Sequence, residues 1–535
     1  MFRFPQRETK LLVAVHGWSG VILGFLLYAV VLTGTIAVFA DEIGGWSVGG
    51  GRHGSPFDGP VDAIVRNLAE QVPAEYRDDV SLFASPSGNL AAFLHKHSKD
   101  ESGALVEEGV SFRVDPTSGR VVHRFEGTDE EVRAKDAESA LSRFLVDTHV
   151  RLYLPNPWGL LLTGILGMAM LVAAISGLLM HRHLLTDIFT LRRGTNRLLV
   201  KRDKHSVAAS WGLPFAFLLA FTGTFFSIAG SFGLPALAMV AFGGDHEAMM
   251  AAIVGEPSVQ NPTPTHPGNL DAMLADARRR TGVEPVFVSI SHYGRADALV
   301  SVFHFPPEGE LELQTLEYNG ASEDFVRNKP RVGTVPSAGS TLLAILGPVH
   351  FGNFAGVLSK AVWVGLGLST CFVLITGLQL WLQRRRAESR VWHAFERALV
   401  VTAYGLPLAM LGSAYAFFAT YPAGDPVSWT PLTFVIVAAV VILAGVLVSS
   451  PIRLGALLAW IMGLSLLALP IARMALTGHG WEEALATNKV EVVAIDLCLM
   501  IAGLCGLWFA WSKTTRGHVE PVEPHVGTLS EGPAE

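Results

Sequence analysis

Eight long apolar stretches constrain this chain more than any other feature of its sequence. Crossing the hydrocarbon core of a bilayer takes about 20 consecutive apolar residues. The stretches of that order are residues 11–39, 158–180, 207–230, 361–382, 398–418, 431–448, 454–475 and 490–511. Half of the 535 residues are hydrophobic, a composition typical of membrane proteins. The sequence therefore predicts a polytopic α-helical membrane protein with about eight transmembrane helices.

The basic residues of the short loops indicate the orientation, because loops rich in lysine and arginine stay in the cytoplasm. These residues follow the second, fourth, sixth and eighth stretches, and they are Arg182, Arg192, Arg193, Arg197, Lys201, Arg202, Lys204, Arg384, Arg385, Arg386, Arg390, Arg397, Arg453, Lys513 and Arg516. We therefore expect both termini in the cytoplasm (N-in, C-in). Two long polar segments, at residues 41–157 and 243–349, would then face the outside.

Each external segment shows the same order of elements, a helical pattern followed by short alternating strands. The patterns are 61–71 followed by 80–84, 90–94 and 110–114, and 270–280 followed by 286–291, 298–303 and 311–318. This order predicts a small α+β module that occurs twice. Residues 115–119 (DPTSG) have turn composition and separate the last two strands of the first module.

The apolar stretches are themselves duplicated. Residues 16–35 read HGWSGVILGFLLYAVVLTGT and residues 205–224 read HSVAASWGLPFAFLLAFTGT. On the returning helices, His149 lies 27 residues before a Ser-Gly-Leu and His350 lies 26 residues before a Thr-Gly-Leu. Both halves enter from the same side, so the unit of helix, module and helix forms a parallel repeat about an axis along the membrane normal. For the Thr-Gly-Thr ends we expect close helix packing.

Four histidines occupy equivalent positions in the two halves. His16 and His205 lie at the cytoplasmic end, and His149 and His350 lie at the outer end. Each one alone fits an interfacial residue, but an ionisable group in a membrane segment is costly and usually functional. The two-fold axis brings each equivalent pair towards one central line. Two imidazoles that face each other in a helix bundle are the axial ligands of a low-spin, electron-transferring haem.

The two histidine pairs would lie at different depths, since 17 residues separate His16 from the Thr-Gly-Thr, or about 25 Å of helix. Two b-type haems would then form an electron path across the membrane. Secondary candidates for a ligand are His181, His183 and His393. A zinc or non-haem iron site would need three or four converging ligands, often carboxylates, which these segments do not offer. The external histidines, expected at the surface or near substrate, are His95, His97, His123, His292 and His304.

The chain resembles the PepSY-associated transmembrane family over roughly residues 10–390. The resemblance rests on the histidine that opens the first helix, the HV and HF pairs before helices two and four, DPTSGRV, and the basic loop before HSVAASWG. It implies an inner-membrane, iron-regulated protein of Gram-negative bacteria that reduces ferric siderophores in the periplasm with two b-type haems in a four-helix core. Carried over to this sequence, the family's haem ligands are His16, His149, His205 and His350. Smaller members end near Arg386, so the last four helices are an extension.

The resulting organisation has seven parts, in which the external modules are periplasmic and PepSY-like. They are 1–40 (transmembrane helix 1), 41–157 (module 1), 158–230 (helices 2 and 3 with a basic cytoplasmic loop), 231–349 (module 2), 350–390 (helix 4), 391–512 (a C-terminal four-helix membrane domain) and 513–535 (a cytoplasmic tail). We expect a cytochrome b-type ferric-chelate reductase whose acceptor is held between the modules.

No dinucleotide or flavin fingerprint appears in the sequence, so the expected electron donor is membrane quinol or a separate cytoplasmic reductase. No nucleic-acid partner is expected. One alternative is a membrane-anchored binding, chaperone or protease-regulating protein without redox activity. Another is a transporter of siderophore or iron. Two observations argue against transport: the first seven apolar stretches carry no carboxylate, and Asp496 in the eighth lies outside the repeat.

Overall fold

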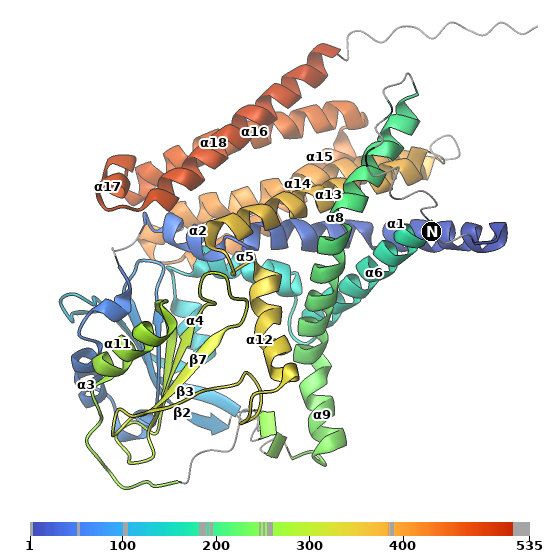
Figure 1. Ribbon diagram of the computed structural model, residues 1–535. Coiled ribbons are helices and arrows are strands. Elements are labelled where there is room, and N and C mark those ends of the chain that lie inside the picture. Colours follow the sequence, from blue (N-terminus) through green and yellow to red (C-terminus); the bar gives the residue numbers. More distant parts are fainter. Residues whose placement is uncertain are drawn as a thin grey trace, which may run out of the picture.

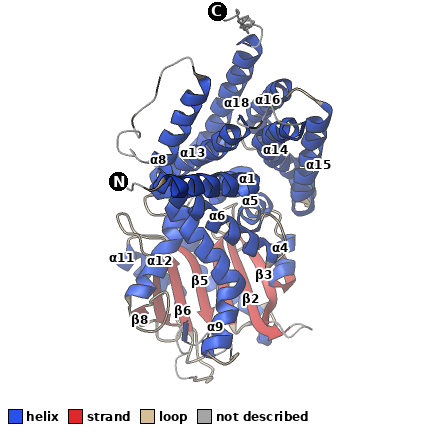
Figure 2. Cartoon of the chain, turned by 90° about the vertical axis from the view of Figure 1, so that its right-hand side faces the viewer, coloured by secondary structure: helices blue, strands red, loops and turns tan. Residues whose placement is uncertain are grey.

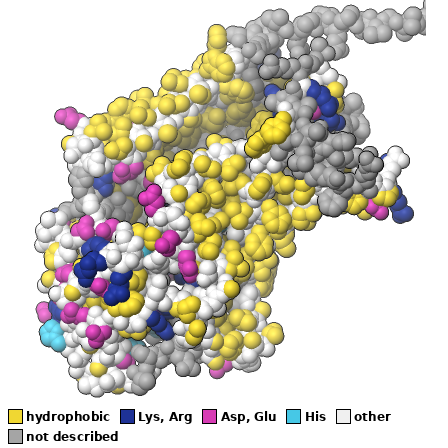
Figure 3. Space-filling view, viewed as in Figure 1, with side chains coloured by type: hydrophobic (Ala, Val, Ile, Leu, Met, Phe, Trp, Pro, Cys, Tyr) yellow, Lys and Arg dark blue, Asp and Glu magenta, His cyan; other side chains and the backbone are white. Residues whose placement is uncertain are grey.

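The computed structural model describes residues 4–50, 54–99, 105–180, 196–245, 260–383 and 390–516, with a few isolated positions between them. Within these residues, eight helices are long and apolar enough to span a bilayer. They are α1 (Gln6–Ala37), α6 (Trp158–Met180), α8 (Arg197–Ile228), α13 (Gly356–Gln383), α14 (Arg390–Thr420), α15 (Pro426–Leu447), α16 (Pro451–Thr477) and α18 (Val490–Arg516). Hydrophobic side chains cover these helices, whereas charged side chains gather over the sheet (Figure 3). The chain is therefore a multi-pass helical membrane protein, as predicted.

The duplicated part supplies a four-helix core. Helix α1 packs against α6 and α13, and α8 packs against the same two helices. The equivalent helices α1 and α8 therefore lie on one diagonal of the core, and α6 and α13 lie on the other. This is the arrangement that a parallel two-fold repeat requires.

The two external modules form one continuous antiparallel sheet with the strand order β4-β3-β2-β1-β5-β6-β7-β8 (Figure 2). The strands are β1 (Asp79–Ala84), β2 (Leu90–Lys99), β3 (Leu105–Val114), β4 (Val121–Thr128), β5 (Pro285–Ser291), β6 (Leu299–His304), β7 (Gln314–Asn319) and β8 (Phe325–Asn328). Strand β4 follows the turn at 115–119, as expected. The order is symmetric about the β1–β5 pair, in which Leu82 lies opposite Val288. The sequence predicted the two modules but not that they would share a sheet.

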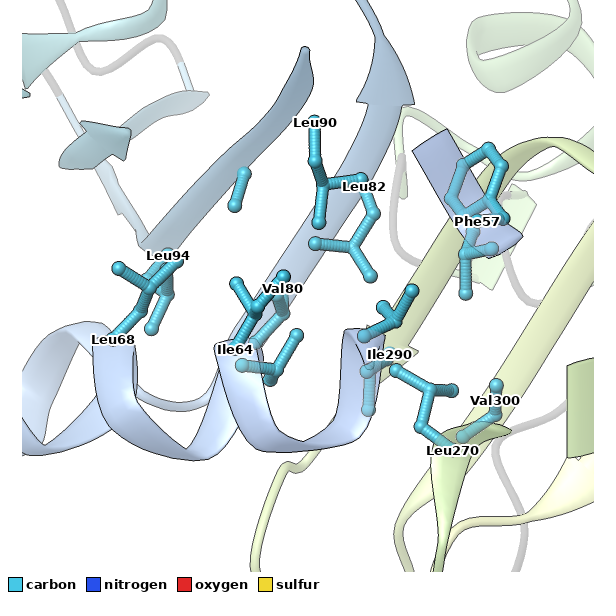
Figure 4. Packing of buried hydrophobic residues seen from close by; sticks show 14 of the residues in the cluster. Phe57, Ile64, Leu68, Val80, Leu82, Leu90, Leu94, Leu270, Ile290 and Val300 are labelled. Atoms are coloured by element: carbon cyan, nitrogen blue, oxygen red, sulfur yellow. The ribbon is translucent and has the colours of Figure 1, made fainter. Parts of the chain in front are cut away.

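One face of the sheet is covered by α3 (Val61–Glu70) and α11 (Leu270–Thr281), and a single hydrophobic core runs across both modules (Figure 4). The two helices also cap each other. Asp62 Oδ1 accepts the backbone N–H of Leu270, and Asp271 Oδ1 accepts the backbone N–H of Asp62, both at 3.2 Å. Strand pairing and core packing thus join the two modules directly.

Two short helices connect the sheet to the returning membrane helices, and both lie outside the eight spans. They are α5 (Ala140–Arg151) before α6 and α12 (Ala338–Phe351) before α13. Arg113 on β3 pairs with Asp136 at 2.8 Å and with Glu138 at 2.6 Å, just ahead of α5. The sheet therefore fixes where α5 begins.

The two halves differ after their first helices. Helix α8 continues through a π-helical turn (Ala229–Gly233) into α9 (Leu234–Ala241). Within them Leu198–Ala241 is one helical segment of 44 residues, about 66 Å long, that extends beside the sheet (Figure 1). In the first half, α1 ends and a separate helix, α2 (Ala40–Ser47), packs against α18 of the C-terminal extension.

A fully buried ion pair lies within this extension, and a hydrogen bond from Trp46 connects it to the duplicated part. Arg473 in α16 donates to Asp496 in α18 at 2.7 Å, and neither side chain is exposed. The indole of Trp46 in α2 donates to Asp496 Oδ1, and the indole of Trp481 in α17 (Trp481–Ala486) donates to Oδ2, both at 2.7 Å. The carboxylate singled out in the eighth apolar stretch therefore has a structural role.

We expect Asp496→Ala to destabilise the protein strongly, because it leaves the Arg473 guanidinium buried without its counter-charge. Breaking a buried ion pair on one side costs about 3–5 kcal/mol. Thermal unfolding of the detergent-solubilised protein, followed by tryptophan fluorescence, should show a clear loss of stability. Glu491→Ala, at an exposed position in the same helix, is the matched control. Equal unfolding temperatures for the two variants would contradict the structural role of Asp496.

Candidate functional site

The four histidines singled out in the sequence lie at two levels of the four-helix core. His16 in α1 and His205 in α8 lie at the end away from the sheet. His149 in α5 and His350 in α12 lie at the sheet end. His149 therefore belongs to a separate short helix and not to the start of α6.

Each histidine ring is held by a neighbouring helix through its Nδ1 atom. The partners are the carbonyl oxygens of Ala173 for His16, Val373 for His205 and Val30 for His149, each at 3.0 Å, and Thr222 Oγ1 for His350 at 2.7 Å. A carbonyl oxygen only accepts, so the ring proton resides on Nδ1 and the lone pair on Nε2. Metal-binding histidines are commonly oriented in this way.

Each ring also lies directly against a glycine that follows a serine or threonine. A Cβ atom added at the glycine would approach the Cε1 atom of the ring, and the four distances are 2.6 Å (Gly34 to His149), 3.1 Å (Gly377 to His205), 3.2 Å (Gly177 to His16) and 3.3 Å (Gly223 to His350). In three cases the accepting carbonyl lies four residues before that glycine. One turn of helix therefore supplies both the space for the histidine ring and the carbonyl oxygen that accepts its Nδ1–H.

This arrangement explains the repeated Thr-Gly-Thr, for which the sequence suggested only packing. Its glycine accommodates a histidine from the sheet end, and its second threonine packs on a glycine of another core helix. Thr35 lies against Gly367 in α13, and Thr224 lies against Gly167 in α6. Sequence reasoning missed the pairing of glycine with histidine, although the spacing of the motifs in both halves contained the signal.

His149 and His350 face each other at the sheet end. Their ring centroids are 6.3 Å apart and the ring planes differ by 28°. A metal–imidazole bond is about 2 Å long and a ring nitrogen lies about 1 Å from the ring centroid, so two imidazoles on opposite sides of one metal ion have centroids about 6 Å apart. Burial lowers the pKa of both imidazoles, which keeps them neutral. The pair has the spacing and the protonation state of axial ligands.

His16 and His205 lie on α1 and α8, which are diagonal to each other in the core. The ring of His16 bonds to α6 and the ring of His205 bonds to α13, the two helices of the other diagonal. Coordination of one haem by His16 and His205 remains a prediction. Of the secondary candidates, His181 and His183 lie outside the described residues. His393 is exposed in the first turn of α14, outside the four-helix core. Among the described residues, only His393 of these candidates is placed, and it lies away from the primary set.

The residues present fit two bis-histidine haems at separate depths. Gly34, which contacts His149, lies 18 residues after His16, and Gly223, which contacts His350, lies 18 residues after His205. In a straight helix this corresponds to about 27 Å. All four histidines direct Nδ1 to a protein acceptor, which leaves coordination to Nε2.

Comparison with known proteins shows which family the chain belongs to. The model of the family described as PepSY-associated TM region matches residues 13–384, and the chain belongs to this family. An uncharacterized protein of Pseudomonas aeruginosa is 26% identical over 424 residues, which cover 71% of this chain and 97% of that relative. The family match ends just before α14 begins, so the four C-terminal spans lie beyond it.

We expect Gly34→Ala to disturb the sheet-end site selectively. The added methyl group would lie 2.6 Å from His149 Cε1, so the ring must move away from the Val30 carbonyl. If the four histidines hold two haems, the purified variant should lose roughly half of the haem and keep the other half. Gly365→Ala in α13, where nothing lies within 4 Å of the added atom, should keep the full content. Unchanged haem in both variants would show that Gly34 does not position a ligand.

Proposed function

We propose that this protein is a di-haem b-type oxidoreductase of the bacterial inner membrane that passes electrons to a ferric siderophore or other ferric chelate in the periplasm. The proposal rests on the observation that neighbouring helices hold all four histidines in position. Each has Nδ1 bonded to a neighbouring helix and its ring packed on a glycine, and the sheet-end pair has a centroid spacing of 6.3 Å. An interfacial histidine needs none of these features.

In this proposal His16 and His205 hold the cytoplasmic haem, and His149 and His350 hold the periplasmic one. Bis-histidine haem supplies one-electron transfer and has no open position for a substrate. The protein supplies the rest. The carbonyls of Ala173, Val373 and Val30 fix the tautomer and orientation of three ligands.

The proposed acceptor is iron, which is the substrate here. Reduction of Fe(III) to Fe(II) weakens its binding to the hard oxygen ligands of a siderophore, so the metal is released without cleavage of the chelator. The external sheet adjoins the His149–His350 pair through α5 and α12, which places a soluble surface beside the proposed exit for electrons. Membrane quinol or a cytoplasmic reductase would supply the electrons.

The two alternative functions receive less support. A membrane-anchored binding or chaperone protein does not require the four braced histidines. A transporter commonly uses intramembrane carboxylates that exchange partners. Asp496, the carboxylate noted in the eighth apolar stretch, is fixed by Arg473 and two indoles.

The purified full-length protein should show an absorption spectrum of low-spin b-type haem that sharpens on reduction with dithionite. Adding a ferric hydroxamate chelate anaerobically to the reduced protein should restore the oxidised spectrum and yield one Fe(II) per electron, trapped by a chromogenic Fe(II) chelator. A colourless protein from haem-replete cells would refute the proposal. Haem that is not reoxidised by ferric chelates would refute the acceptor.

Replacing one ligand at a time should remove only the haem at the level where that ligand lies. His149→Ala and His350→Ala should each remove the haem at the sheet end, and His16→Ala and His205→Ala should each remove the other, so every variant keeps roughly half of the haem. His393→Ala, at an exposed histidine outside the core, is the control and should keep all of it. Two different residual spectra, one for each level, are expected. A variant of His205 that resembles one of His149 would show that the pairs are assigned wrongly.

A further inference from the structure

A second group of potential metal ligands lies in the external sheet, away from the membrane histidines. It consists of Asp79 at the start of β1 and His95 and His97 on β2. Asp79 pairs with His95 across the antiparallel ladder. His97 follows two residues later, so its side chain lies on the same face of the sheet. The strand register thus brings all three side chains together.

The distances are close to those of a ligand set. One ligand atom from each of the three residues lies within 4.8 Å of the others. His97 Nε2 is 3.5 Å from Asp79 Oδ2. Ligands bound at about 2 Å to one ion lie at most about 4 Å apart, so small side-chain movements would complete coordination. A fourth ligand is within reach, because Glu107 on β3 places Oε2 3.8 Å from His95 Nε2.

The ring of His95 is held in position. Its Nδ1 lies 3.3 Å from the carbonyl oxygen of Phe93, which leaves Nε2 for an ion, and the ring of Phe93 stacks on it at 4.6 Å. His95 is 4% exposed. Opposite it on β3 is Gly109, where a Cβ atom would collide with the His95 backbone and Cβ. A histidine that is buried, has a fixed tautomer and lies beside two carboxylates is not an ordinary surface residue. These features suit a metal ligand.

We propose that Asp79, His95 and His97, with Glu107 as a possible fourth ligand, bind a first-row divalent transition-metal cation in the external sheet. Two imidazole nitrogens and one carboxylate form the donor set that binds Fe(II) with open positions in many non-haem iron proteins. A plain ion pair between Asp79 and His97 would not require His95 to be buried and oriented alongside.

The site is separate from the membrane histidines. Asp79 and Ala84 are the two ends of β1, about 17 Å apart in an extended strand. Pro86, just after β1, packs near Gly44 of α2 and so marks the membrane-proximal end. Since Fe(II) is the product of the proposed reduction, the site is placed to receive released iron. This last assignment rests on the proposed function, whereas the cation site itself does not.

The test is equilibrium dialysis of the untagged full-length protein in detergent against Co(II), with metal counted by mass spectrometry. We expect one Co(II) per chain. His97→Gln and Asp79→Asn should each weaken binding by about tenfold or more, and the double variant His95→Gln/His97→Gln should abolish it. His123→Gln, at an exposed histidine on β4, is the control and should bind normally. Unchanged haem content in every variant shows that the fold is intact.

Each outcome of this experiment either supports or overturns the proposed cation site. No bound Co(II) in the wild type, or undiminished binding by the double variant, overturns the site. His149→Ala should lose haem and keep Co(II) binding, so the failure of one proposal is distinguishable from the failure of the other. Anaerobic Fe(II) should displace Co(II) only in excess, because Fe(II) precedes Co(II) in the affinity order for such ligands. No displacement at any excess would overturn the assignment of iron and leave the cation site standing.

Discussion

The contact between each membrane histidine and a glycine of a neighbouring helix is the constraint on which the rest of the structure depends. An imidazole fits there only because the glycine has no side chain. At Gly34 even one methyl group would lie 2.6 Å from the ring. The same close approach recurs between helices, where Thr35 packs on Gly367 and Thr224 on Gly167. The spacing of the core helices and the orientation of the histidines are therefore set together.

The external sheet extends this constraint beyond the membrane. Direct pairing of β1 with β5 and the mutual capping by Asp62 and Asp271 join the two halves of the repeat into one body. Arg113 connects that body to the start of α5, the helix that carries His149. A fused sheet therefore helps to hold His149 and His350 at a fixed separation, whereas two independent modules would allow the short helices to move apart.

The C-terminal helices contact both halves of the repeat, because α14 also packs on α13 through the ring of Trp381, whereas two hydrogen bonds join them to the first half. Asp496 receives hydrogen bonds from Arg473 and from Trp46 of α2, and the hydroxyl of Tyr28 in α1 donates to the carbonyl of Ala403 in α14 at 3.0 Å. In the second half, α8 continues into α9, which extends beside the sheet (Figure 1). The extension thus breaks the two-fold symmetry at the helix ends and leaves the four-helix core symmetric.

The sequence by itself determined the eight spans, the duplication, the helix and first three strands of each module, and the four histidines. Hydropathy, strand alternation and the repeat of His16 and His205 are local or periodic signals, which can be recognised without any knowledge of packing. It did not reveal that Gly34 and its three counterparts accommodate the histidines, that β1 pairs with β5, or that Asp79 meets His95 and His97. Those contacts join residues far apart in the chain, so only the packing of helices and the register of strands decided them.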